Sequence, residues 1–553
     1  MERIEKELKN ALKSSNNVPY PDFDGMWSSI QRDELRDASV EPIALRSRKR
    51  KRFVMVAGLS IALLATPVYA ALTYDWSNIL TYRQGIESAL EQGLGQTIEQ
   101  SVTKDGITLT VHTAFSDDNR TFLLYTLKPD SSWDGKNISF DRIGLKDEKG
   151  NFIEGYYSVQ DWDEERGLFQ GYFETDWIVD GQSANVAFSV ENMQFMDEGK
   201  QSINYDPNNS NTQEFPIQKD GIGSVTLKSF EQAEDRVLLQ SSITFTNPEM
   251  KNKSWVRIQA NNERNEPIRE AETSRFGFPG ASGEYLRSQQ IFKTDTLRAE
   301  GTKFQLAYNH ILETVEGTWS LDLALSKSKL ENGSFREVLN IPLDDMSAGT
   351  VVQEMTVTPT QIRLILAHKQ KYTRVPYMDY QLDVGGTLLS GSMWNLNVPG
   401  QPDKTEIRFE MDGLDWASLA EQPVSLIAKH RVDEFKGDEK PIRLTDISSE
   451  QQSITTHIAG YPVTWTYYLK DKNLYIESFS SDKKFGGVNQ TYYLHGKDKN
   501  YGMPEILGLM GDGSNKNMDV YENFDRTELD IYISNYTTNK PNDEMRVQLK
   551  AGK

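Results

Sequence analysis

The residue types that most often carry catalysis are scattered in this chain. Its six histidines form no His-Glu-x-x-His pair for zinc. It has no Gly-x-Ser-x-Gly nucleophile elbow, the nearest run being Gly280-Ala281-Ser282-Gly283, and no P-loop ending in Gly-Lys-Ser or Gly-Lys-Thr. It also lacks cysteine, which excludes disulfides and thiol nucleophiles. These absences predict a protein that is not an enzyme and has no catalytic, cofactor-binding or metal site.

Two acidic clusters and three tyrosine pairs leave other chemistry open. The clusters within Asp161–Glu165 and Asp512–Glu522 offer carboxylates for calcium, but neither has the alternating ligand spacing of a helix-loop-helix site. Tyr156-Tyr157, Tyr467-Tyr468 and Tyr492-Tyr493 could stack on sugars or a peptide, although tyrosines on strands are often plain sheet surface. A secreted hydrolase whose site is assembled from distant strand ends is a third alternative, because loops on sandwiches carry no fixed spacing.

An uncharged segment of 22 residues, Phe53–Tyr74, divides the chain. As a helix it spans about 33 Å, enough to cross a bilayer. The segment follows a basic run that predicts the membrane topology: Arg46, Arg48, Lys49, Arg50, Lys51 and Arg52. Since positive residues stay in the cytoplasm, we expect a single-pass cell-membrane protein with residues 1–52 inside and the large C-terminal body outside.

Cleavage by signal peptidase is the alternative to an anchor. Small residues at Val68 and Ala70 resemble a cleavage site, and cutting after Ala70 would free the outer body. Secretory signals, however, total about 15–30 residues with a short charged start. Here 52 residues come first, so we favour an uncleaved anchor.

The predicted cytoplasmic arm has two short stretches with apolar residues at helical spacing. The candidate partner-binding residues on their apolar faces are Ile4, Leu8, Leu12, Phe23, Trp27 and Ile30. An arm this short cannot bury a sizeable core. These apolar faces therefore either bind a partner, or pack against the inner leaflet of the membrane or against each other. Residues 1–52 hold 12 Lys and Arg against 9 Asp and Glu, whereas the remainder holds 49 against 72. That acidic excess argues against nucleic-acid binding.

Beyond Asp105 the apolar residues alternate with period two, which is typical of strands. Four hairpins recur about every 100–130 residues, the size of one sandwich domain. They pair 106–111 with 122–127, 224–227 with 237–245, 354–358 with 362–366, and 463–467 with 474–478. We expect an alternating strand to close each module: Val186–Val190, Trp319–Leu325, Val424–Ala428 and Leu529–Ile533, respectively.

The predicted fold is therefore mainly β: tandem immunoglobulin-like β-sandwich modules outside, one transmembrane helix and a short α-helical cytoplasmic arm. The predicted domains are the arm (1–52), the transmembrane helix (53–74), a helical neck (75–104) and β-sandwich modules at 105–215, 216–345, 346–450 and 451–553.

Two motifs carry a resemblance. The first motif consists of Gln100–Val111 and Asp118-Asn119-Arg120-Thr121, and it follows a basic stop and a single span. This order resembles a family of bacterial membrane proteins, mostly from Gram-positive spore formers. The first outer domain of that family is catalogued as a domain of unknown function. A second catalogued domain of that family is similar to residues around Thr350-Val351-Val352 and Thr356–Thr360. Members of this family look like membrane-bound anti-sigma factors.

The resemblance implies that the arm holds an extracytoplasmic-function sigma factor at the membrane and that a signal outside, from an unknown envelope ligand, relieves the hold. Residues 1–52 contain neither His nor Cys, so the zinc-stabilised inner domain of many anti-sigma factors is excluded. The alternative is an envelope adhesion or wall-binding protein whose arm is only a topological tail.

Overall fold

The computed structural model describes residues 74–552, within one compact unit, Ala65–Lys553. The gaps are 131–136, 210, 233–234, 247–254, 272–274, 279–285, 328–332, 345, 347–348, 396–397, 415–418, 420, 471 and 507–514. The predicted arm, its candidate partner-binding residues, the basic run and residues 53–73 of the predicted span all lie outside the described residues. No helix within the described ranges is both long and apolar enough to cross a bilayer.

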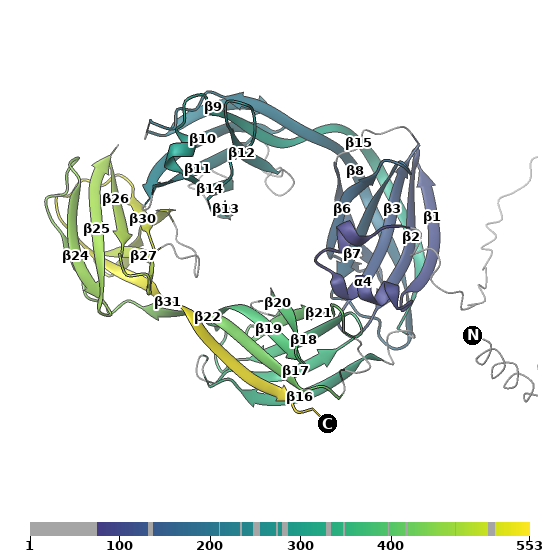
Figure 1. Ribbon diagram of the computed structural model, residues 1–553. Coiled ribbons are helices and arrows are strands. Elements are labelled where there is room, and N and C mark those ends of the chain that lie inside the picture. Colours follow the sequence, from purple (N-terminus) through teal and green to yellow (C-terminus); the bar gives the residue numbers. More distant parts are fainter. Residues whose placement is uncertain are drawn as a thin grey trace, which may run out of the picture. The chain divides into compact units, whose positions relative to one another are not determined.

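Strands dominate the described structure (Figure 1), and its three named helices are short. These are α3 (Ser77–Leu80), α4 (Gln84–Glu91) and α5 (Thr294–Leu297). Helices α3 and α4 bury Trp76, Leu80 and Ile86 against Phe115 and Phe122 of the adjoining sheet. Residues 96–104, expected to belong to a helical neck, instead form strand β1 (Gln96–Lys104).

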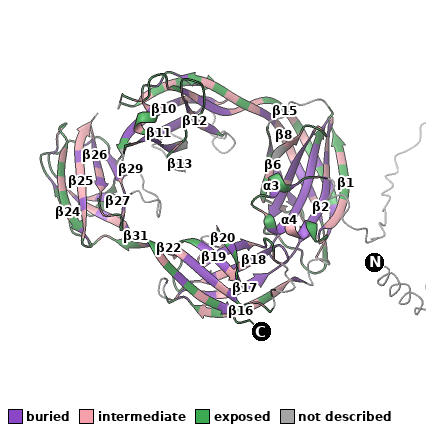
Figure 2. Cartoon of the chain, viewed as in Figure 1, coloured by how far each residue is buried: buried purple, intermediate pink, exposed green. Residues whose placement is uncertain are grey.

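Module 1 is a two-layer sandwich. Its first sheet has the order β1-β2-β3-β7-β6 and adds β2 (Ile107–Ser116), β3 (Thr121–Pro129), β7 (Leu168–Thr175) and β6 (Tyr156–Asp163). The second sheet has the order β12-β15-β8-β4-β5 and consists of β12 (Val256–Asn261), β15 (Lys303–Ser326), β8 (Ser183–Ile203), β4 (Asn137–Lys146) and β5 (Phe152–Ile153). Apolar side chains such as Leu109, Tyr125 and Phe188 form the core of this sandwich. Figure 2 shows long stretches of these strands coloured as buried.

Strands β8 and β15, of 21 and 24 residues, continue from module 1 into module 2 (Figure 1). There the far half of the second sheet packs on a third sheet, through a core that includes Leu227, Leu239 and Leu306. The third sheet has the order β13-β14-β11-β10-β9, with β13 (Arg275–Phe278), β14 (Leu286–Lys293), β11 (Arg236–Phe245), β10 (Ile222–Gln232) and β9 (Gln213–Lys219).

Module 3 is built on a fourth sheet of 11 strands that continues into module 4. Its order is β16-β17-β18-β21-β20-β19-β22-β31-β27-β28, and β23 pairs with β31. The strands are β16 (Phe335–Pro342), β17 (Val351–Val357), β18 (Gln361–Ala367), β21 (Lys404–Glu410), β20 (Thr387–Asn395), β19 (Tyr377–Val384), β22 (Val424–Lys436), β31 (Leu529–Lys550), β27 (Phe485–His495), β28 (Asp498–Tyr501) and β23 (Ile442–Leu444).

Strand β31 serves two cores. Its first part places Leu529 and Ile531 in the core of module 4, and its last part places Met545 and Leu549 in that of module 3. A fifth sheet completes module 4 in the order β24-β25-β26-β30-β29, with β24 (Gln452–Ile458), β25 (Tyr461–Lys470), β26 (Asn473–Phe479), β30 (Asn517–Tyr521) and β29 (Met503–Ile506).

All four hairpins expected from the sequence are confirmed as antiparallel pairs: β2 with β3, β10 with β11, β17 with β18, and β25 with β26. Turn chemistry supports the neighbouring β1–β2 hairpin, where Asp105 and Gly106 have φ of 47° and 73°. A two-residue turn of this kind needs positive φ at both positions, which Asp-Gly tolerates well.

The strand expected to close module 2 lies elsewhere. Trp319, Leu321, Leu323 and Leu325 of β15 pair with residues 184–190 of β8 and belong to the core of module 1. The expectation was wrong because β15 is one continuous strand of 24 residues that returns from module 2 to module 1, pairing with β8 along its length through two register shifts. Val186–Val190, Val424–Ala428 and Leu529–Ile533 do lie in the cores to which they were assigned.

Candidate functional site

Two tight turns meet where module 1 contacts module 3. The turn between β2 and β3, Asp117–Arg120, is closed by the Asp117 N–H, which donates to the Arg120 carbonyl at 3.1 Å. The turn between β17 and β18, Thr358–Gln361, closes in the same way at 2.9 Å. Each turn also uses its first side chain, since Asp117 Oδ1 accepts from the Asn119 and Arg120 amides and Thr358 Oγ1 accepts from the Gln361 amide. Asx and Ser/Thr turns of this kind hold the backbone rigid.

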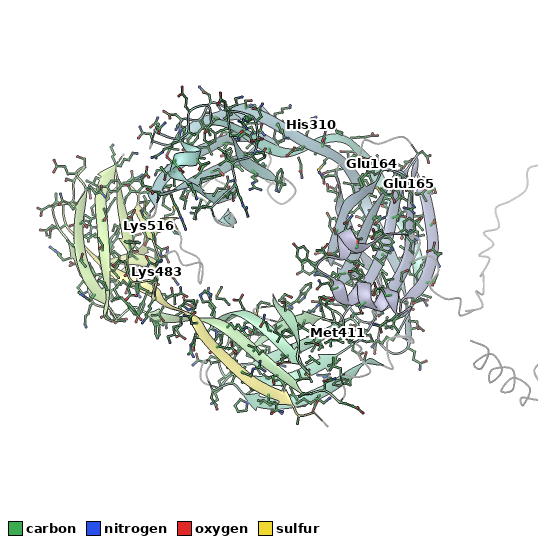
Figure 3. The ribbon with its side chains drawn as sticks, viewed as in Figure 1. Glu164, Glu165, His310, Met411, Lys483 and Lys516 are labelled. Carbon is green, nitrogen blue, oxygen red and sulfur yellow. The ribbon has the colours of Figure 1, made fainter. Side chains whose placement is uncertain are left out.

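The two turns hydrogen-bond each other directly. Thr360 Oγ1 donates to Asp117 Oδ2 at 2.7 Å, and Asn119 Nδ2 donates to the Gln361 carbonyl at 3.2 Å. Arg120 Nη2 donates to the Thr360 carbonyl at 3.1 Å. All five of these residues are at least 98% buried, so the contact excludes water from its polar groups. Met411, labelled in Figure 3, lies beside it and donates its N–H to the Thr360 carbonyl.

Arg120 lies between two carboxylates from different modules. Its Nη1 is 2.8 Å from Glu174 Oε1 of β7 and 2.9 Å from Glu410 Oε1 of β21, and its Nη2 is 2.9 Å from Glu410 Oε2. Burial alone would lower the pKa of Arg120, but Glu410 and Glu174 more than offset it and raise the pKa. Burial alone would raise the pKa of Glu174, yet Arg120 and Arg83 hold it below its ordinary value. Both shifts favour the charged forms of Arg120 and Glu174, which supports an ion pair between them at neutral pH.

The segment around α3 and α4 joins the same cluster. Arg83 Nε donates to Glu174 Oε2 at 2.5 Å, and the Gly85 N–H donates to Glu410 Oε2 at 3.2 Å. A Cβ added at Gly85 would overlap the carbonyl oxygen of Thr360, so only glycine permits this approach. We call this cluster the Arg120 network: Arg83, Gly85, Asp117, Asn119, Arg120, Glu174, Thr360 and Glu410.

Aromatic side chains border the network. The Trp394 ring lies under two cations, Arg83 at 5.5 Å and Arg408 at 4.2 Å, and its Nε1 donates to Asp176 at 3.2 Å. Arg408 also bridges the modules, with Nη2 at 2.7 Å from Asp176 Oδ1. Such cation–π contacts contribute most when they are shielded from water. The whole arrangement links two modules and one helical segment.

Modules 2 and 4 also touch, at the faces of the third and fifth sheets. Phe230, Leu238 and Ile291 pack against Tyr475 and Met518. At its edge Lys516, labelled in Figure 3, donates to the Glu231 carbonyl at 2.9 Å and pairs with Glu477. Each module is thus linked both to the module with which it shares long strands and to one module of the other pair.

Four of the six histidines, His112, His310, His368 and His430, hydrogen-bond different neighbours and do not share a partner. His112 bonds Glu99 and Thr126, and His368 bonds Thr350 and Thr405. Over the residues that the structure places, no three His, Asp or Glu side chains gather as metal ligands. In the acidic run, Glu164 and Glu165 (Figure 3) are exposed. These observations leave the expected absence of a metal site a prediction.

The sequence had singled out Asp118–Thr121 and Thr356–Thr360 as motifs without assigning them a role. Arg83, Glu174 and Glu410 were missed because each reads as an ordinary surface charge, and nothing local pairs residues 290 positions apart. One feature of the sequence could have indicated a buried charge here: in the turn from Asp117 to Arg120, an arginine directly precedes an apolar strand.

Comparison with known proteins covers the N-terminal part of this cluster. The model of a family described as a domain of unknown function (DUF4179) matches residues 45–129, whose described part contains Arg83, Gly85, Asp117, Asn119 and Arg120. No curated protein matches the chain. A solved structure titled "The crystal structure of the conserved domain protein from Bacillus anthracis" is 9% identical and covers 57% of this chain and 90% of its own, but its TM-score of 0.16 is too low to indicate a shared fold. The expected resemblance to a catalogued domain of unknown function is confirmed for residues 45–129.

Proposed function

We propose that this chain is a single-pass regulatory membrane protein of the anti-sigma-factor kind. Its arm, residues 1–52, sequesters a sigma factor, Phe53–Tyr74 crosses the bilayer, and the immunoglobulin-like β modules respond to an envelope ligand outside. The acidic excess beyond residue 52 and the DUF4179 match support this proposal. The resemblance named above supplies the sigma-factor partner.

One observation carries the proposal: the segment that follows the predicted span is held by both module 1 and module 3. Arg83 and Gly85 lie only nine and eleven residues after Tyr74, and they bond Glu174 of module 1 and Glu410 of module 3. A change in how these modules contact each other therefore acts directly on the chain next to the predicted membrane surface. A tethered adhesion protein needs no such coupling.

The test is co-purification of the full-length protein from cell membranes, followed by identification of bound proteins. We expect a sigma factor with the wild type and a strong loss with Trp27→Ala, because removing a buried indole anchor costs about 2 kcal/mol or more. Tyr501→Ala is the matched control, since Tyr501 is a 47% exposed aromatic side chain of the outer body. Recovery of no sigma factor from wild-type membranes would favour the adhesion alternative.

A further inference from the structure

A groove runs over the second sheet where β8 and β15 pass from module 1 to module 2. It consists of two cavities, of about 520 Å³ and 190 Å³, which share Glu198 and Trp255. The larger is lined by Asn137, Ile138 and Ser139 of β4, Tyr157 of β6, Met196 of β8 and Asn309 of β15. His310, labelled in Figure 3, follows Asn309 on that strand. Together the cavities have the volume of a small-molecule site.

Two aromatic side chains stand open at this groove. Trp255 is 46% exposed and Tyr157 is 39% exposed, although aromatic side chains of this size usually bury most of their surface. Their position in a cavity lining distinguishes them from the other exposed aromatics of the described chain, such as Tyr82 and Tyr372, which line neither cavity. An open aromatic face in a concave site provides a stacking surface for a flat, partly apolar ligand.

The polar groups of the lining favour a neutral ligand over a charged one. Its charged side chains already have partners, with Glu198 paired to Lys200 at 2.6 Å and Arg257 paired to Glu270. The larger cavity adds the uncharged side chains Asn137, Ser139 and Asn309. Amides and hydroxyls can donate and accept hydrogen bonds without demanding a counter-charge.

One buried acceptor in the smaller cavity has no partner. Gln290 is 1% exposed, and its Nε2 donates to the Ile258 carbonyl at 3.0 Å and to Glu270 at 2.7 Å. Because both neighbours are acceptors, the amide orientation is settled, and Gln290 Oε1 is left without a hydrogen bond. The smaller cavity is thus bordered by a neutral amide whose acceptor is unsatisfied, and no charge of this residue calls for an ionic ligand.

We propose that this groove binds a neutral oligosaccharide. Pyranose rings stack their apolar faces on Trp255 and Tyr157 and present hydroxyls to Asn309 and Ser139. A peptide added as an extra strand is disfavoured, because the 265–268 segment already covers the outer edge of β12: the Ile268 N–H donates to the Ala260 carbonyl at 2.8 Å, and Pro267 bridges Asn261. This site stands independently of the proposed regulatory role, although it would supply the ligand for it.

The test is calorimetric titration of the purified full-length chain, in a detergent without a sugar headgroup, with two uncharged probes: a tetrasaccharide of N-acetylglucosamine and one of glucose. We expect saturable binding of at least one probe below about 10 mM. Trp255→Ala should weaken that binding by about tenfold or more, and Asn309→Ala by about threefold. Tyr82→Ala, an 83% exposed aromatic outside the groove, should leave it unchanged.

Because Trp255 is nearly half exposed, its removal leaves no void in a core, and an unchanged melting temperature confirms that the variant is folded. The proposal is overturned if neither probe binds saturably, if Trp255→Ala binds like the wild type, or if unrelated extended peptides displace the sugar with higher affinity. None of these results depends on whether residues 1–52 bind a sigma factor.

Discussion

Arg120 and Glu410, which are 290 residues apart, form a bidentate ion pair across the contact between modules 1 and 3. Both N–H···O distances are 2.9 Å, and the arginine side chain is 1% exposed against 19% for the glutamate. The planar guanidinium matches a carboxylate in this geometry, which fixes orientation as well as distance. The pair therefore determines the register of the two modules and not merely their attraction.

We predict that Arg120→Ala opens this contact. The substitution leaves Glu174 buried with only Arg83 as an ionic partner, and breaking a buried pair from one side costs about 3–5 kcal/mol. Hydrogen exchange of the full-length chain should show faster exchange at both turns, 117–120 and 358–361.

The control for this variant is Arg166→Ala, which removes an ion pair with Asp163 whose arginine is 46% exposed. Exposed pairs are worth about 0–1 kcal/mol, so the control should leave both turns protected. Equal protection in Arg120→Ala and wild type would show that the remaining hydrogen bonds hold the modules without the arginine.

Gly85→Ala should separate the α4 segment from module 3 while leaving α4 itself intact. Alanine is the better helix former by about 1 kcal/mol, so any loss comes from the overlap of the new Cβ with the Thr360 carbonyl. We expect cross-linking or spin-label distances between α4 and the β17–β18 turn to lengthen.

Glu91→Ala, at an exposed position of the same helix, provides the comparison for Gly85→Ala. If both variants keep the wild-type distance between α4 and the β17–β18 turn, then the Thr360 backbone moves aside without cost. The close approach at Gly85 would then have no coupling role.

Local patterns predicted the hairpins but not their wider arrangement. Alternation at residues 106–127 or 463–478 specifies a paired surface within a short stretch of chain, and those pairs are present. Strand β15 shows the limit: it runs as one strand through 24 residues, although its alternation changes phase at two register shifts between Ile311 and Thr318. Such a shift does not tell which sheet each half packs on, so the sequence did not show that Phe304 and Trp319 enter different cores. Likewise, Arg120 and Glu410 lie on separate hairpins, and only the packed modules bring their charges together.

The two halves of β15 can be separated by mutation. Trp319 is fully buried in module 1, where its Nε1 donates to the Lys104 and Ile107 carbonyls at 3.2 and 3.1 Å. Trp319→Ala should cost about 3–5 kcal/mol and speed hydrogen exchange in β2 and β3. The reciprocal variant Phe304→Ala should act on β10 and β11 of module 2. If Trp319→Ala instead loosened β10 and β11 first, the assignment of its ring to module 1 would be wrong.

A buried carboxyl group makes the stability of module 4 depend on pH. Asp519 of β30 is 5% exposed, and burial raises its pKa to about 7, although the Thr491 N–H and hydroxyl, both at 2.6 Å from Oδ2, partly oppose the shift. The folded module therefore keeps a proton that the unfolded chain releases near its ordinary pKa of about 4.

The sign follows from this difference. The contribution of Asp519 to stability is fully present below about pH 4, falls as the pH rises, and levels off above about pH 7. Asp519→Asn, which stays neutral, should remove that decline. Because a shift of one pKa unit corresponds to about 1.4 kcal/mol, the decline in the free energy of unfolding that the variant avoids is a few kcal/mol. Melting temperatures of both proteins measured by calorimetry between about pH 4 and pH 8 should therefore diverge in favour of the variant as the pH rises.

Asp530→Asn serves as the control for the same module, since Asp530 is 42% exposed and its pair with Arg443 lies at the surface. Other carboxylates titrate in this range as well, but they do so equally in all three proteins, so the difference between wild type and Asp519→Asn isolates the buried group. If the melting temperatures of these two proteins instead changed with pH in the same way, the hydrogen bonds from Thr491 would compensate the buried charge. Asp519 would then be ionised in the folded module at neutral pH.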